Sequence, residues 1–284
     1  MNIREVAVIG AGTMGRGIAQ AFAAHEYQVV FYARRPAGVQ EGYDSIVNIL
    51  DSMVQKGKIS SEKRSRTLKN LKTTSTLSDA KDADLVVESI AEELSRKQDM
   101  MHRLEELCRP EALLTTNTSS ISITAIAANL RYPQRVCGMH FFYPPPKMPV
   151  IEVAVARQTS PDTVKTVKEI VASIDKTAIE VQESPGFVFN RLMIPMINEA
   201  AYLLMEGVAT REDIDAIMCL AASHPIGPLA LADIIGLDVC LNIMEVLQHE
   251  LGDDKYRPCP LLRRMVYGKQ LGKKTGKGFY SYTG

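Results

Sequence analysis

The chain has 284 residues, 46% of them hydrophobic, so it is long enough to build one large domain or two of medium size around sizeable cores. Lysine and arginine together number 33, as do aspartate and glutamate, and a formal net charge of zero gives no global electrostatic basis for binding nucleic acid or an anionic membrane. We therefore expect neither as a partner, and any bound anion must be held by a local cluster of positive charge.

The five cysteines are widely spaced, odd in number and include no C-x-x-C pair. This usage argues against a disulfide framework and a thiolate metal site, and no other cluster of His, Cys, Asp or Glu has metal-ligand spacing. No apolar run has the length of a membrane span, and the strand-like stretch from Glu5 follows Met1 too closely to leave room for a signal peptide. We expect a cytoplasmic protein without a metal.

The N-terminal residues predict a β-α-β unit. Residues 6–10, VAVIG, form a short β-branched run typical of a strand buried on both faces. Residues 14–26 have helical character, and residues 27–32, YQVVFY, form a second buried strand. Such a unit opens a parallel, doubly wound sheet, so we predict an α/β fold that begins with a Rossmann-like domain.

Residues 38–71 are polar and helical, with a break at KGKISSEK (residues 56–63), and predict a two-helix insert in this domain. Strands then resume, mostly separated by helices, with clear helical spacing of apolar residues in 104–114 and 161–174. The strand candidates are residues 71–76, 84–90, 112–117, 135–142, 150–156 and 177–182.

The pattern changes at Glu183. Beyond it we predict only helices until a short terminal strand at residues 278–282, GFYSY. The chain is therefore expected to divide into a mostly parallel, doubly wound domain, residues 1–183, and a smaller all-helical domain, residues 184–284. The predicted helices of the second domain are residues 189–207, 210–223, 231–251 and 259–270.

The sequence GAGTMG at residues 10–15 fits the pattern G-x-G-x-x-G and lies between a predicted strand and a predicted helix. Gly10 allows the tight turn, Gly12 lets the main chain approach a pyrophosphate, and Gly15 allows close packing of helix on strand. Thr13 and Met14 begin the helix, whose N–H groups and positive dipole end favour phosphate. We expect a dinucleotide to bind at this turn.

The stretch QVVFYARRPAG at residues 28–38 bears on the choice of cofactor. Many NAD-binding proteins place a carboxylate at the end of this strand, where it accepts hydrogen bonds from the ribose. Here Ala33 occupies that position, followed by Arg34 and Arg35. Ala33 removes the repulsion of a 2′-phosphate, which either arginine can grip. The sequence favours NADP(H) over NAD(H). The alternative is that the two arginines are simply exposed in a loop, and that the protein binds both cofactors or binds NAD poorly.

Four further motifs occur in order: NTSS (117–120), GMHFFYPPP (138–146), VIEV (150–153) and SPGFVFNR (184–191). With the glycine turn and the terminal GKKTGKGFYSY, they closely resemble the 3-hydroxyacyl-CoA dehydrogenase family, particularly its bacterial 3-hydroxybutyryl-CoA branch. The resemblance covers essentially the whole chain. It implies a nicotinamide-dependent oxidoreductase that acts on an acyl-CoA and forms a homodimer through the helical domain.

Residue by residue, the resemblance implies that His140 is the catalytic acid/base, that Glu152 holds its imidazole, and that Ser119 and Asn190 hydrogen-bond the reacting oxygen. The chemistry is consistent, because a histidine with a carboxylate partner suits proton transfer near neutral pH and neutral donors stabilise charge on oxygen. The structural alternatives are a core histidine, an N-cap for the helix after Ser119, and a cap or turn role for Asn190.

The resemblance also implies that Glu92, Lys97 and Lys274 contact the cofactor and that Lys56 meets the phosphates of coenzyme A. Charged residues at helix ends are also common for structural reasons alone, and Lys56 lies in a charged stretch that can simply be a solvated face. Tyr143 stands where the family usually has an asparagine that contacts the cofactor, so this contact is in doubt.

The sequence therefore predicts an enzyme that interconverts acetoacetyl-CoA and (S)-3-hydroxybutyryl-CoA, in the NADPH-linked reductive direction of short-chain (butyrate) metabolism. One alternative is a related hydroxy-acid dehydrogenase, of the gulonate or crystallin-like kind, that needs no coenzyme A. The other is a non-catalytic nucleotide-binding protein that keeps the fold.

Overall fold

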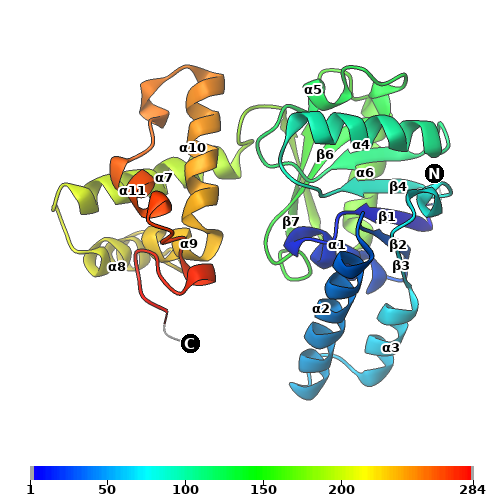
Figure 1. Ribbon diagram of the computed structural model, residues 1–284, viewed down its shortest axis with the longest axis horizontal. Helices are drawn as coiled ribbons and strands as arrows, with labels where there is room; N and C mark the ends of the chain where they lie inside the picture. Colours follow the sequence, from blue (N-terminus) through cyan, green and yellow to red (C-terminus); the bar gives the residue numbers. More distant parts are fainter. Residues whose placement is uncertain (1–2, 283–284) are drawn as a thin grey trace. The chain divides into compact units, whose positions relative to one another are not determined.

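The computed structural model describes residues 3–282, and the chain divides into two compact units, Met1–Glu183 and Ser184–Gly284 (Figure 1). The first unit contains one eight-stranded sheet in the order β3-β2-β1-β4-β5-β6-β7-β8. All neighbours are parallel except β6 and β7. The strands are β1 Glu5–Ile9, β2 Gln28–Tyr32, β3 Leu71–Thr74, β4 Leu85–Glu88, β5 Leu113–Thr116, β6 Val136–Phe141, β7 Val150–Val155 and β8 Thr177–Gln182.

The sheet order reverses direction between β1 and β4, as in doubly wound folds, which confirms the predicted fold class. All the strands that the sequence predicts in this unit form. In doubly wound sheets, ligands bind outside the carboxyl ends of the strands where the order reverses. The glycine turn after β1 and the ends of β4 and β5 therefore lie where a cofactor site is expected.

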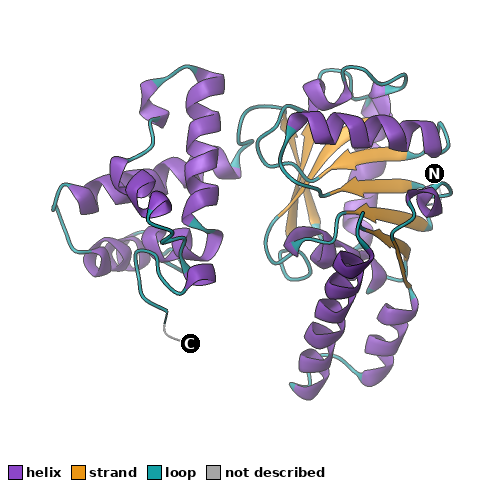
Figure 2. Ribbon diagram, in the orientation of Figure 1, coloured by secondary structure: helices purple, strands orange, loops and turns teal. Residues whose placement is uncertain are grey.

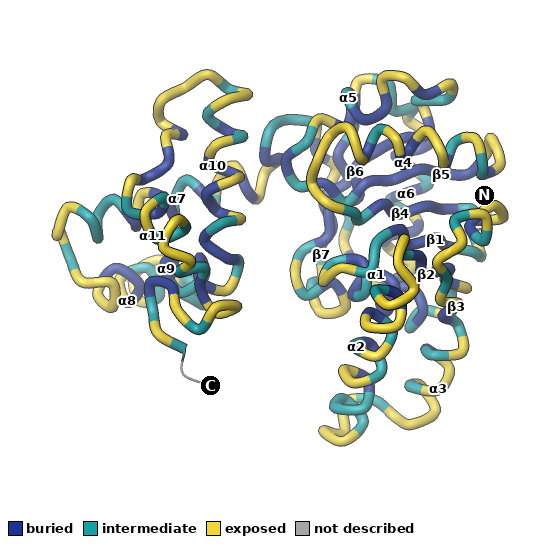
Figure 3. Tube along the Cα trace, in the orientation of Figure 1, coloured by how far each residue is buried: buried dark blue, intermediate teal, exposed yellow. Residues whose placement is uncertain are grey.

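Helices lie on both faces of the sheet (Figure 2). Apolar residues of α1, α2 and α6 share one core with alternate residues of the strands, such as Val6 and Val8 in β1. The other helices of the sheet, α4 and α5, contact β5 and β6. The central strands are buried along their length (Figure 3). The helices are α1 Thr13–Ala23, α2 Pro36–Gln55, α3 Ser61–Lys69, α4 Leu94–Leu107, α5 Ile123–Ala127 and α6 Pro161–Ser173, with 3-10 turns η1 Leu77–Ala80 and η2 Pro133–Arg135.

The predicted two-helix insert is the hairpin of α2 and α3, which extends beyond the edge of the sheet (Figure 1). The chain reverses at Gly57, which has φ +65°. The helix predicted from apolar spacing over residues 104–114 is wrong in its second half, because α4 ends at Leu107 and β5 begins at Leu113. Pro110 between them has no N–H to continue a helix.

The second unit consists of helices around one apolar core. One predicted helix, residues 231–251, is in fact two, because Gly236 between α9 and α10 has φ +105°, which a helix cannot accommodate. The helices are α7 Phe189–Met205, α8 Arg211–Ala221, α9 Pro228–Ile235, α10 Leu237–Leu251 and α11 Pro260–Tyr267, with 3-10 turns η3 Asp254–Tyr256 and η4 Lys273–Thr275.

The predicted terminal strand at residues 278–282 is also wrong. Only isolated bridges form there, Gly272 with Lys277 and Lys277 with Ser281. Buried Asp233 holds this segment instead, because its carboxylate accepts the Phe279 N–H at 2.9 Å and the Tyr280 N–H at 2.8 Å. The Asp233 carboxylate thus accepts main-chain N–H groups that, in a strand, would donate to a neighbouring strand.

Candidate active site

The glycine turn has the geometry that dinucleotide binding requires. Gly10 has φ +120°, and a Cβ there would lie 2.3 Å from the carbonyl oxygen of Ser89. A Cβ on Gly15 would lie 1.8 Å from the Gly10 oxygen, so only glycine lets α1 pack this closely. At Gly12, by contrast, a Cβ would meet no atom within 4 Å.

This open side of Gly12 adjoins the N-terminus of α1, which begins at Thr13 and Met14 with no side-chain cap. The turn therefore has space beside exposed main chain and the positive end of a helix dipole, which fits the pyrophosphate of a dinucleotide. The residues present fit the group that the sequence pattern predicts.

The end of β2 presents positive charge without a carboxylate. Ala33 follows the strand, and its N–H donates to Thr74 O at 3.2 Å. Arg34 and Arg35 are exposed, and neither forms an ion pair with any residue among 3–282. Both guanidinium groups are thus available to an anionic ligand at this edge.

His140 and Glu152 form the central polar pair of the site. They are direct partners in the antiparallel register of β6 and β7, and His140 Nδ1 lies 2.7 Å from Glu152 Oε2. Both residues are buried. The Phe142 ring lies 4.8 Å from the imidazole ring, centroid to centroid. Since a carboxylate accepts hydrogen bonds, the contact places the proton on Nδ1.

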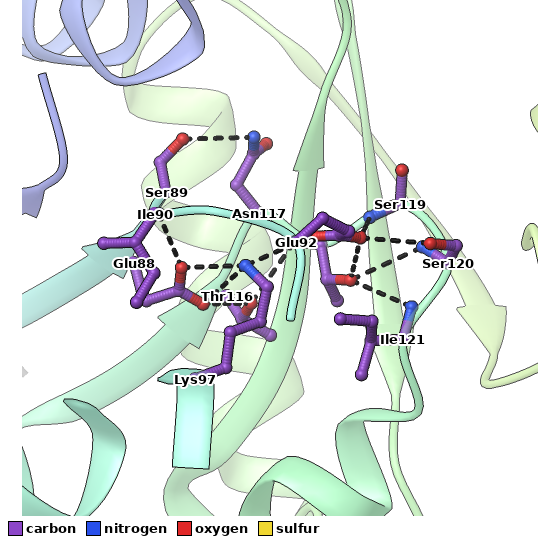
Figure 4. A network of polar contacts seen from close by, with 11 residues as sticks. Glu88, Ser89, Ile90, Glu92, Lys97, Thr116, Asn117, Ser119, Ser120 and Ile121 are labelled. Atoms are coloured by element: carbon purple, nitrogen blue, oxygen red, sulfur yellow. Dashed lines mark hydrogen bonds and ion pairs between the residues drawn. The ribbon is translucent and has the colours of Figure 1, made fainter. Parts of the chain in front are cut away.

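The segment that carries Ser119 follows β5, and Glu92 holds its first residues. Glu92 Oε1 accepts Thr118 Oγ1 at 2.5 Å, the Ser119 N–H at 3.0 Å and Ser120 Oγ at 3.1 Å (Figure 4). Burial alone would raise the pKa of Glu92, but Lys97 and these hydrogen bonds hold that pKa below its usual value. Glu92 is therefore an ionised anchor for three consecutive residues.

Lys97 lies beneath this anchor. Its Nζ lies 2.8 Å from Glu88 Oε1 and 3.2 Å from Glu92 Oε2, and its side chain is 1% exposed. Glu88, at the end of β4, also accepts Thr116 Oγ1 at 2.7 Å. The Lys97 ammonium is thus enclosed between two carboxylates, so this chain's structure gives it the role of fixing Glu92.

Sequence reasoning did not find Glu88 or Asn117. Asn117 Oδ1 accepts the Phe141 N–H at 2.9 Å, its Nδ2 lies 3.4 Å from Ser89 Oγ, and its own N–H donates to Glu88 O at 2.8 Å. The side chain therefore joins the ends of β4, β5 and β6, and its contact with Ser89 is seen in Figure 4. The one feature of the sequence that pointed to Asn117 was its position as the first residue of the NTSS motif.

The alternative role of Ser119 as a helix cap is wrong. Helix α5 begins at Ile123, and its N-cap is Ser122, whose side chain accepts the Ala125 N–H at 3.1 Å. Ser119 lies three residues before this cap, in the loop between β5 and α5.

The remaining predicted residues are described within their own units. Tyr143 is 60% exposed in the loop after β6, and Lys56 is exposed at the end of α2. In the second unit, Asn190 is buried near the start of α7, and Lys274 Nζ lies 2.5 Å from Asp238 Oδ1. Lys274 therefore has a carboxylate partner within its own unit.

Among residues 3–282, no group of three or more His, Cys, Asp or Glu side chains is placed to hold a metal ion. Over the same range, no helix combines the length and apolar character of a bilayer span.

A strand-turn-helix that fits a dinucleotide, next to a buried histidine-carboxylate pair, defines a nicotinamide-dependent oxidoreductase. Comparison with known proteins specifies the family. Residues 5–184 match the 3-hydroxyacyl-CoA dehydrogenase, NAD binding domain, and residues 186–282 match the 3-hydroxyacyl-CoA dehydrogenase, C-terminal domain. The chain belongs to the 3-hydroxyacyl-CoA dehydrogenase family, as its motifs predicted.

Similar proteins match over their whole length. A protein of Bacillus subtilis named probable 3-hydroxybutyryl-CoA dehydrogenase is 47% identical over 282 residues, which cover 99% of this chain and 98% of its own. The 3-hydroxybutyryl-CoA dehydrogenase of Clostridioides difficile is 46% identical and covers 98% of this chain and 99% of its own. The crystal structure of (S)-3-hydroxybutyryl-CoA dehydrogenase from Ralstonia eutropha has a TM-score of 0.95 at 43% identity and covers 100% of both chains.

Proposed function

We propose that this enzyme interconverts acetoacetyl-CoA and (S)-3-hydroxybutyryl-CoA, with NADP(H) as the preferred cofactor. The names of the similar proteins support the substrate. The observation that carries the chemistry is the buried contact of 2.7 Å between His140 Nδ1 and Glu152 Oε2. It orients the imidazole and fixes which nitrogen exchanges the proton.

In the reductive direction, the carbonyl carbon gains a hydride and its oxygen gains a proton. The nicotinamide, when bound, supplies the hydride. His140 Nε2 donates the proton to the oxygen, and the charge of Glu152 stabilises the imidazolium before that transfer. In the oxidative direction, the same nitrogen accepts the proton from the hydroxyl group.

Two neutral donors complete the proposed site. The Ser119 hydroxyl and the Asn190 amide hydrogen-bond the reacting oxygen, where negative charge develops as hydride arrives. Each such donor typically contributes about 2–4 kcal/mol to transition-state stabilisation. Glu92 supports this role of Ser119, because it accepts the Ser119 N–H and the hydroxyls of the two flanking residues, Thr118 and Ser120. We further propose that Lys56 meets phosphates of coenzyme A.

The cofactor preference rests on the end of β2. Ala33 presents no carboxylate to repel a 2′-phosphate, and neither Arg34 nor Arg35 forms an ion pair with a residue among 3–282. A guanidinium without a protein partner is suited to bind a phosphate through paired N–H donors. The Gly10–Gly15 turn, Glu92, Lys97, Ser119, Tyr143 and Lys274 remain the proposed contacts to the rest of the cofactor. NADPH preference fits the reductive direction of a butyrate-forming pathway.

The test is the steady-state reduction of acetoacetyl-CoA, with NADPH and NADH titrated separately. We expect kcat/KM with NADPH to be higher by tenfold or more, which corresponds to about 1.4 kcal/mol. Arg34→Ala and Arg35→Ala should each be measured with both cofactors. The variant that lacks the phosphate-binding arginine should lose the preference for NADPH, while its kcat/KM with NADH stays unchanged. Equal rates with both cofactors would remove the NADPH proposal. Turnover of free acetoacetate but not of its coenzyme A thioester would favour the relatives that need no coenzyme A.

We also propose a cytoplasmic homodimer that associates through the helical unit. Large apolar side chains are exposed on its helices, with Leu192 at 70%, Ile217 at 64% and Leu220 at 85%. Such exposure is typical of an interaction surface. The five cysteines are free thiols, which fits a reducing compartment. Sedimentation of the wild type and of Leu220→Lys tests the dimer, and a wild type that sediments as a monomer would contradict it.

A further inference from the structure

The segment that carries Ser119 is held at its far end by a second carboxylate, which the proposed reaction does not use. Glu183 accepts a hydrogen bond from Ser122 Oγ through Oε1, and it accepts the Thr124 N–H at 3.0 Å and the Thr124 hydroxyl through Oε2. Residues 118–124 are therefore fixed at one end by Glu92 and at the other by Glu183, with Ser119 between them.

Glu183 has a distinctive position in the chain. It is the last residue of the first unit, and its own N–H donates to Val155 O at 3.0 Å, just beyond the pairing of β7 and β8. The chain then passes through Ser184, Pro185 and Gly186, which has φ +73°, to α7. Asn190, the second proposed donor to the substrate oxygen, follows Glu183 by only seven residues.

We infer that Glu183 is a positioning residue for the reaction, an inference that rests on the proposed function. Its carboxylate ties the point where the chain leaves the first unit to the segment that carries Ser119. The proposed donors Ser119 and Asn190 are thereby connected through one side chain. A loss of this contact releases residues 122–124 from Glu183, so that the segment that carries Ser119 is held by Glu92 at one end alone.

A glutamate side chain suits this task because the three groups around its two oxygens are all donors. Two hydroxyls and one main-chain N–H point at its two oxygens, and a carboxylate accepts hydrogen bonds at both. A glutamine places an NH₂ group on one side. If the NH₂ group takes the place of Oε2, it faces the Thr124 N–H, and two donors cannot bond to each other. If it takes the place of Oε1, the Ser122 hydroxyl must reorient to accept a hydrogen bond. Glu183→Gln therefore weakens the contact with little change in side-chain volume.

The test compares Glu183→Gln with Glu180→Gln, a matched control on β8. Glu180 is exposed and pairs with Lys168 at 3.0 Å on the surface. We expect kcat/KM for acetoacetyl-CoA to fall about tenfold in Glu183→Gln, because small displacements of reacting groups cost large factors in rate. The Kd of the cofactor should not change, since the glycine turn does not contact Glu183. Glu180→Gln should match the wild type in both measurements.

A purely structural role predicts a different result. In that case Glu183→Gln lowers the Tm, and well below this temperature the folded variant keeps the wild-type kcat/KM, which would overturn the inference. A wild type without activity on acetoacetyl-CoA would instead overturn the proposed function, so the two failures are distinct.

The partner side of the contact provides a second test that does not alter Glu183. Thr124→Val removes the hydroxyl that donates to Glu183, whereas Thr124→Ser retains it. We expect Thr124→Val to reduce kcat/KM and Thr124→Ser to restore most of it. In a double-mutant cycle, Thr124→Val should cost little more in the Glu183→Gln background, since the interaction is already lost. Fully additive losses would contradict the inference.

Discussion

His140 and Glu152 lie side by side because they are direct partners in the register of β6 and β7. Directly opposite residues in an antiparallel pair have Cβ atoms about 4.5–5.5 Å apart, within reach of an imidazole and a carboxylate. Among residues 3–282, β6 and β7 are the only antiparallel neighbours in this sheet. Burial of both residues then strengthens the charged hydrogen bond.

Glu152→Gln should therefore lower kcat by about 10²–10⁴, the range associated with a correctly oriented general acid/base. The amide can present its NH₂ group to Nδ1 and so favour the wrong tautomer, and it lacks the charge that stabilises the imidazolium. The measurement is kcat for acetoacetyl-CoA reduction, with the Kd of the cofactor as the control for intact binding. A variant with wild-type kcat would show that Glu152 only packs against the ring.

Sequence reasoning found the residues with a motif around them and missed those whose role depends on tertiary contacts. His140 and Glu152 were placed on neighbouring strands from the pattern alone. Glu88, Asn117 and Glu183 are also polar residues at strand ends, and neither the NTSS motif around Asn117 nor the change of pattern at Glu183 shows which groups these side chains bond. Each has a partner that is distant in the chain, such as Thr116 for Glu88, Phe141 for Asn117 and Ser122 for Glu183, so only the folded sheet shows these contacts.

The turn between β1 and α1 uses three glycines for three different purposes. Gly10 and Gly15 allow close approach of main chain within the protein, whereas Gly12 borders open space. Two substitutions at these positions should therefore separate folding from cofactor binding, although each adds only one methyl group.

Gly15→Ala should lower the free energy of unfolding by about 1–3 kcal/mol or more, since the added Cβ overlaps the Gly10 carbonyl oxygen and the core resists overpacking. Gly12→Ala should leave the Tm close to that of the wild type and raise the Kd of the cofactor at least tenfold. Thermal unfolding and cofactor titration of both variants check this contrast. A stable Gly12→Ala that binds the cofactor normally would exclude Gly12 from the binding site.

The elements that the sequence predicted correctly are those with strong local signals. The buried strands β1, β2, β4 and β5 are apolar runs, and α7 and α8 show clear periodicity. The two errors in the second unit arose where local pattern and tertiary structure disagree. Gly236 breaks the helix, although the spacing of apolar residues continues across it. The segment 278–282 alternates like a strand, but its main-chain N–H groups bond to Asp233.

At the scale of the whole molecule, two buried aspartates hold the end of the chain in the helical unit. Tyr280 OH donates to Asp215 Oδ2 at 2.9 Å, and Tyr282 OH donates to Asp233 Oδ2 at 3.1 Å. Burial and the aspartates raise the pKa of Tyr280 above its usual range and raise the pKa of Tyr282 to about 12. The folded state therefore retains these protons at a pH where the unfolded chain loses them.

Stability that depends on these protons is fully present below pH 10, the ordinary tyrosine value, and is lost as the pH rises through about 12. We expect the wild-type Tm to fall over this interval more steeply than the Tm of Tyr282→Phe, which has no phenolic proton to lose. Thermal unfolding of both proteins at a series of alkaline pH values measures the difference. Parallel curves would show that Tyr282 contributes nothing to the alkaline transition.

The anchoring of residues 278–282 also has a consequence for attempts to shorten the protein. Phe279, Tyr280 and Tyr282 supply three donors to the buried Asp233 carboxylate, and Tyr280 supplies one to Asp215. Removal of this segment takes these donors away from carboxylates inside the helical unit, and a buried carboxylate that loses its donors is costly. A truncation before residue 278 therefore destabilises the helical unit, while residues 3–183 keep every strand of their sheet.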